Sequence, residues 1–167
     1  ARGLERTFEE TLRGELGQIT RRVDTKQEDR LPFVPGEDVR TTLSLTCCAL
    51  EDGTEARELV RQHVAFYIGG MGTYYRDNLA RQGHEEVAHT VYDEWNGGDR
   101  EEALAAIDDD LLDSIAVGGT PDEARDLLAE FADLDHVDSL SISFPRGASV
   151  AQILETMEAL APSATAE

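Results

Sequence analysis

The chain has 167 residues, of which 40% are hydrophobic, and it carries 35 acidic residues against 15 lysines and arginines, a formal net charge of -20. This length and apolar content fit one ordinary domain with a hydrophobic core. The acidic excess excludes nucleic acid and anionic membrane surfaces as partners, because both are bound by clusters of Lys and Arg.

The basic residues are almost all arginines, since Lys26 is the only lysine. Repulsion among so many carboxylates destabilises a folded chain unless molar salt screens it. An acidic protein of an ordinary cytosol is the alternative, but the near absence of lysine favours a halophilic protein. We therefore expect stability to increase with salt.

Residues 1–40 are expected to form an entry helix and a linker. Apolar residues follow helical spacing from the start, at Leu4, Phe8, Leu12 and Leu16. Because the sequence begins with Ala1 inside this pattern, we interpret it as a fragment of a longer protein. It contains no charged-then-apolar leader and no apolar stretch of the roughly 20 residues that span a bilayer, which indicates a cytoplasmic protein.

Residues 41–68 are predicted to form one βα unit. The stretch 41–50 is rich in β-formers and almost uncharged, and a helix is expected to begin at Thr54 after a turn. Cys47 and Cys48 are adjacent, so a strand directs them to opposite faces and a disulfide between them is strained. We interpret both as reduced core residues.

Residues 69–110 differ from a regular βα unit and are interpreted as a helical insertion. Glycines interrupt the preceding helix, and two helical stretches follow, about 73–95 and 100–107, separated by Asn96-Gly97-Gly98.

Residues 111–161 are expected to form the last βα units, before a flexible tail at 162–167. Thr120, Pro121 and Glu123 predict the capping box of a helix, residues 137–144 alternate as a strand does, and Ser149 with Gln152 predicts a second cap. Strands that alternate with amphipathic helices indicate an α/β fold with a parallel sheet, either a barrel or a doubly wound sheet.

Several runs are familiar in their order and spacing: Arg61-Gln62-His63-Val64-Ala65-Phe66-Tyr67-Ile68-Gly69-Gly70-Met71-Gly72-Thr73-Tyr74-Tyr75, Asn78-Leu79-Ala80-Arg81-Gln82-Gly83, Trp95-Asn96-Gly97-Gly98-Asp99-Arg100, Val117-Gly118-Gly119-Thr120-Pro121-Asp122-Glu123-Ala124 and Ser143-Phe144-Pro145-Arg146-Gly147-Ala148-Ser149. From about residue 40 to 161, the chain resembles the C-terminal region of luciferase-like oxidoreductases. The greatest likeness is to the deazaflavin-dependent branch that includes methylenetetrahydromethanopterin reductase.

The resemblance implies that the chain is the C-terminal part of a TIM (β/α)8 barrel with a helical insertion, its active site at the C-terminal ends of the strands. It also implies hydride transfer between reduced deazaflavin (coenzyme F420) and an organic substrate, with a pterin C1 carrier as one candidate. A haloarchaeal source fits both the charge and that cofactor. An FMN-dependent monooxygenase is the alternative chemistry, and a non-catalytic chain that needs a partner for the first half of the barrel is the alternative class.

Candidate binding residues follow from the positions of two runs. Arg146, beside Phe144, is expected at the barrel rim, where its guanidinium can hold an anionic group of a cofactor or substrate. The alternative, that Arg146 pairs with a neighbouring carboxylate, is favoured. Gly118, Gly119 and Thr120 offer N–H groups to an anion at a helix start, although capping by the chain's own side chains is the favoured interpretation.

No other site is indicated. The four histidines and two cysteines lack metal-ligand spacing, so no bound metal is expected, and no motif for covalent catalysis occurs. The aromatic residues Phe66, Tyr67, Tyr74 and Tyr75 are interpreted as core or subunit contacts, with a ring-stacking site as the less favoured alternative. A small-molecule substrate and a homo-oligomer built on this helical region are therefore expected.

Overall fold

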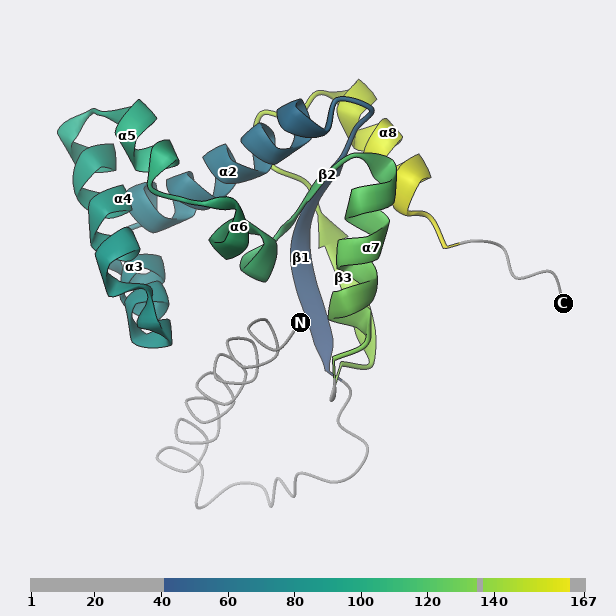
Figure 1. Ribbon diagram of the computed structural model, residues 1–167, viewed down its shortest axis with the longest axis horizontal. Helices are drawn as coiled ribbons and strands as arrows, with labels where there is room; N and C mark the ends of the chain where they lie inside the picture. The colour runs from purple at the N-terminus through teal and green to yellow at the C-terminus, as the bar shows by residue number, and fades with distance from the viewer. Residues whose placement is uncertain (1–40, 135–136, 163–167) are drawn as a thin grey trace, which may run out of the picture.

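The computed structural model describes residues 41–134 and 137–162, so the predicted entry helix at 1–40 and most of the predicted tail lie outside it. Its centre is a three-stranded sheet in which β1 (Thr42–Ala49) lies between β2 (Val117–Gly119) and β3 (Ser139–Ser143). Both pairings are parallel. Figure 1 shows this sheet with helices around it.

The two neighbours of β1 pair with different halves of it. β2 pairs with the C-terminal half, from Cys47 opposite Val117 to Ala49 opposite Gly119. β3 pairs with the N-terminal half, from Thr42 opposite Ser139 to Thr46 opposite Ser143. The C-terminal end of β3 therefore lies beside the middle of β1.

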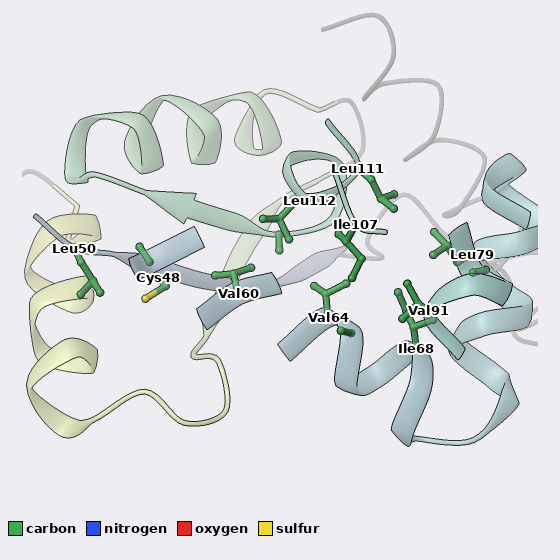
Figure 2. Close-up of a cluster of buried hydrophobic side chains, with 14 residues drawn as sticks. Cys48, Leu50, Val60, Val64, Ile68, Leu79, Val91, Ile107, Leu111 and Leu112 are labelled. Carbon is green, nitrogen blue, oxygen red and sulfur yellow. The ribbon is translucent and has the colours of Figure 1, made fainter. Parts of the chain in front are cut away.

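Helices cover both faces of the sheet. On one face, Cys48 packs with the long helix α2 (Gly53–Gly70) in a buried cluster that Figure 2 shows running along that helix. On the other face, Cys47 packs with α7 (Pro121–Ala132) and α8 (Val150–Leu160). The strand thus separates two apolar cores.

Five short elements connect α2 to β2, and the first four gather at the end of α2 that points away from the sheet (Figure 1). They are α3 (Thr73–Leu79), the π-helical turn η1 (Ala80–His84), α4 (Glu85–Gly97), α5 (Arg100–Ala105) and α6 (Asp109–Ile115). Aspartate side chains cap α2, α5 and α6, each accepting a backbone N–H of the first turn.

Several predicted boundaries differ from the structure. The stretch 73–95 is interrupted by η1, because Gly83 adopts a left-handed conformation with φ 97° that breaks a regular helix. The stretch that leads into β2 from Leu111 begins as a helix, α6, and only Val117–Gly119 is strand. Helix α2 begins at Gly53 and not at Thr54, because Asp52 is the cap.

The expected α/β class and parallel sheet are confirmed, whereas the described residues do not show a closed barrel. In a barrel, strands pair in chain order and the helices form an outer ring. Here the strand order is β2-β1-β3, so the chain moves towards one edge of the sheet from β1 to β2 and back past β1 to the other edge from β2 to β3. Right-handed crossovers then place α2 and α7 on opposite faces, as observed.

Within residues 41–134 and 137–162, none of the helices combines the length and apolarity needed to cross a membrane.

Candidate functional site

A cleft of about 630 Å³ lies between the sheet and the helices α2 and α3, within the size range of small-molecule sites. Its lining residues are Ser44, Thr46, His63, Val64, Tyr67, Ile68, Tyr75, Asn78, Leu79, Gln82, Ile115, Ser143, Phe144 and Arg146.

The sheet face beside the cleft carries a row of hydroxyl groups, of which those of Ser44, Thr46 and Ser143 line the cleft. Side chains alternate between the faces of a strand, and those on this face are Ser or Thr from Thr42 to Thr46 on β1 and from Ser139 to Ser143 on β3. Thr42 pairs with Ser139 at 2.7 Å, and Thr46 pairs with Ser143 at 3.2 Å, measured between hydroxyl oxygens. Parallel sheets are usually covered on both faces by apolar contacts, so this hydroxyl-lined face is unusual.

His63 projects from α2 against this sheet face. Its Nδ1 accepts the backbone N–H of Arg146 at 3.0 Å, and its Nε2 lies 3.4 Å from the hydroxyl oxygen of Thr46. Burial of the ring and, secondarily, the positive charge of Arg146 lower the pKa of His63 below its ordinary value of 6.5. The imidazole is therefore neutral at pH 7, with its single proton on Nε2.

Arg146 lies in the turn after β3, where Gly147 has a left-handed φ of 89° that favours glycine. Its guanidinium carbon lies 3.7 Å from the centre of the Phe66 ring, a cation–π contact. Among the described residues, no carboxylate forms an ion pair with Arg146. The pairing with a neighbouring carboxylate that the sequence favoured is therefore not observed among them. Arg146 lines the cleft beside Phe144.

Aromatic rings form the helical side of the cleft. Tyr67 stacks on His63 with ring centres 4.7 Å apart, and its ring meets that of Tyr75 edge-on at 4.9 Å. These rings give the cleft a rigid apolar surface. Tyr74 is 55% exposed outside the cleft, and self-association through this region stays a prediction.

Two amide side chains complete this wall. Asn78 lies near the end of α3 and Gln82 lies in the π-helical turn. Their spacing of four residues places them on one side of these consecutive turns. Each amide offers both a donor and an acceptor to a ligand.

Gly118, Gly119 and Thr120 lie apart from the cleft. The carboxylate of Glu123 accepts both the backbone N–H and the hydroxyl of Thr120 at 2.8 Å, which lowers the pKa of Glu123. The predicted capping box is confirmed, and the chain's own carboxylate occupies these donors. A Cβ atom on Gly118 would lie 3.2 Å from the Cα of Arg57, so this glycine allows close contact between β2 and α2.

The structure thus brings Arg146 and Phe144 together with residues that were not predicted as binding residues from the sequence. His63, Thr46, Ser143 and Tyr67 belong to this group. The hydroxyls carry a sequence signal, because alternating Ser and Thr in two apolar strands predicts a polar face. No pattern in the sequence predicts that β1 and β3 are neighbours in the sheet.

Within the part of the chain that the structure describes, no group of three or more His, Cys, Asp or Glu residues is close enough to hold a metal ion.

Comparison with protein-family models gives a match. The family model for luciferase-like monooxygenases matches residues 25–135, which is more than half of the 167-residue chain. The match contains β1, α2 and α3, and it ends before β3 and Arg146. No curated protein and no solved structure matches the chain. On the strength of the family match, the chain belongs to the luciferase-like monooxygenase family.

Proposed function

We propose that the cleft binds the heteroaromatic ring of a flavin or deazaflavin for an oxidoreductase reaction. Members of the family are generally flavin- or F420-dependent oxidoreductases. The observation that carries the proposal is the arrangement of the cleft: hydroxyl groups of the sheet and aromatic rings of the helices line it together with Arg146, which has no carboxylate partner among the described residues.

The residues present fit such a group. The cleft has the volume of a small-molecule site, and Tyr67 and Tyr75 supply ring surfaces. Polar groups that fix orientation are few and line the cleft: the hydroxyls of Thr46 and Ser143 and the amides of Asn78 and Gln82. A guanidinium holds carboxylate or phosphate groups through paired hydrogen bonds, which suits the anionic tail of either cofactor.

In this proposal, a bound flavin or deazaflavin supplies the hydride chemistry, and the protein orients it. Tyr67 and Val64 exclude water from one side of the ring. The hydroxyls of Thr46 and Ser143 set its in-plane orientation, and Arg146 binds the anionic tail. His63 is neutral and hydrogen-bonded at both nitrogens, so it positions Arg146 and Thr46 and does not act as a general base.

The finer assignment is hydride transfer between reduced coenzyme F420 and an organic substrate, with a pterin C1 carrier as one candidate. The FMN-dependent monooxygenase is the second candidate, because the family description names that activity. These two candidate functions require different cofactors, so titration of the chain with each cofactor distinguishes them.

The test is equilibrium binding of coenzyme F420, FMN and riboflavin to the chain in molar KCl, followed by quenching of ligand fluorescence. FMN differs from riboflavin by a phosphate, so Arg146→Gln should weaken FMN binding roughly tenfold and leave riboflavin unchanged. Arg125→Gln is the matched control, because Arg125 lies on α7 outside the cleft. No binding of any ligand, or equal effects of the two variants, would contradict the proposal.

A further inference from the structure

A continuous chain of hydrogen bonds runs along this sheet face from one backbone group to another. At one end, the backbone N–H of Arg146 donates to Nδ1 of His63 at 3.0 Å. A neutral imidazole carries one N–H, so accepting at Nδ1 leaves the proton on Nε2. That N–H faces the hydroxyl oxygen of Thr46 at 3.4 Å, a long hydrogen bond in which His63 is the donor.

The other end of the chain is also fixed by the backbone. The hydroxyl of Ser143 donates to the carbonyl of Leu45 at 3.1 Å. A serine hydroxyl has one proton, and the assignment in which every donor of the chain finds an acceptor gives that proton to Leu45, so that Ser143 accepts from Thr46, whose oxygen lies 3.2 Å away. Thr46 therefore donates to Ser143 and accepts from His63.

Every proton in this chain is used within the protein. Each hydroxyl oxygen has two lone pairs, and the neighbours described above occupy one lone pair on Thr46 and one on Ser143. The lone pairs that remain belong to residues that line the cleft. The Thr46–Ser143 pair is thus a hydrogen-bond acceptor towards a ligand and not a donor.

We infer that the Thr46–Ser143 pair selects a ligand edge that carries an N–H or O–H donor, and discriminates against a carbonyl edge or an alkylated nitrogen at that place. A carbonyl there would face oxygen lone pairs with no proton between them, which leaves a desolvated acceptor unpaired. The inference rests on the proposed function, because it assigns the edge of the bound heteroaromatic ring that the protein recognises.

Ser44 provides a matched control on the same sheet face. It lies two residues before Thr46 on the same side of β1 and lines the cleft, but it takes no part in the chain of hydrogen bonds. Removing its hydroxyl alters the polarity of the cleft without releasing any proton of the Thr46–Ser143 pair.

The experiment compares riboflavin with 3-methylriboflavin, in which a methyl group replaces the ring N–H, by fluorescence titration in molar KCl. For the unmodified chain and for Ser44→Ala, methylation should weaken binding about tenfold. Thr46→Val keeps the shape and removes the acceptor that Thr46 contributes, so the difference between the two ligands should shrink. If the loss were steric, Thr46→Val would retain it.

Ser143→Ala gives an independent readout. Without its partner on β3, the proton of Thr46 is free to point into the cleft, so the preference for the unmethylated ligand should fall although Thr46 is still present. Equal binding of the two ligands by the unmodified chain would overturn the inference and leave the proposed function standing. Failure of riboflavin to bind at all would overturn the proposed function, and the inference with it.

Discussion

Nδ1 of His63 accepts the backbone N–H of Arg146 at 3.0 Å and so joins α2 to the turn that follows β3. The bond exists only while the imidazole is neutral, because a protonated Nδ1 is a donor facing another donor. Protonation of one side chain therefore releases the turn that holds the arginine of the cleft.

Stability should consequently depend on pH near the ordinary pKa of histidine. The folded-state pKa of His63 lies below 6.5. Above 6.5 neither state binds the proton and stability is complete. As the pH falls through 6.5, the unfolded chain binds a proton that the folded chain does not, so the free energy of unfolding decreases until the lowered pKa is reached.

Denaturant unfolding measured from about pH 7.5 down to about pH 5.5 tests this dependence. His63→Asn is the control, since its amide oxygen can accept the Arg146 N–H and does not titrate in this range. The variant should lose the part of the pH dependence that belongs to His63. An identical slope in both proteins would show that the bond to Arg146 is not coupled to protonation.

A second relationship fixes α8 to the end of β1. The hydroxyl of Thr156, which is 1% exposed, accepts the N–H of Ala49 at 3.1 Å and donates to its carbonyl at 3.3 Å. Thr156→Val should destabilise the protein by about 1–3 kcal/mol, because buried backbone groups lose their partner. Thr156→Ser keeps the hydroxyl and should cost less in the same denaturation experiment. Equal losses would mean that the methyl group, not the hydroxyl, matters there.

Features governed by neighbouring residues were predictable from the sequence. The capping boxes at Thr120 and Ser149 are confirmed, because a cap depends on residues within one turn. The strands around Leu45 and Ile142 are confirmed for a similar reason, since alternation and β-propensity are local.

Features that depend on distant residues were not predictable in this way. The position of β1 between β2 and β3 depends on crossover direction, which no local pattern encodes. His63 illustrates the same limit for the site. Its ring gains hydrogen-bond partners from Thr46 on β1 and from Arg146, 83 positions later in the chain, and no local pattern predicts either approach.

The crossing of α2 and α4 depends on Gly69. A Cβ atom there would lie 2.4 Å from the Cβ of Trp95, far inside contact distance. Gly69→Ala should therefore destabilise the protein by about 1–3 kcal/mol through overpacking. Gly97→Ala is the control, because nothing lies within 4 Å of its added Cβ and alanine favours the helix. Thermal unfolding should separate the two, and a harmless Gly69→Ala would mean that the helices can move apart freely.

The two adjacent cysteines report separately on the two cores. Burial raises the pKa of Cys47 to about 12 and also raises that of Cys48, so the thiolate fraction at neutral pH is very small. Neither thiol should be alkylated by iodoacetamide in the folded chain at about pH 8, and both should react in guanidinium. Peptide mass spectrometry identifies the modified residue.

Selective alkylation in the folded state would show which face of the sheet opens first. Cys48 packs with α2, so its reaction means that α2 lifts from the sheet, with loss of the cleft wall that carries His63. Cys47 packs with α7 and α8, so its reaction means that those helices separate while the cleft persists. If both react at the rate seen in guanidinium, the sheet is not covered in solution, and the two-core arrangement is wrong.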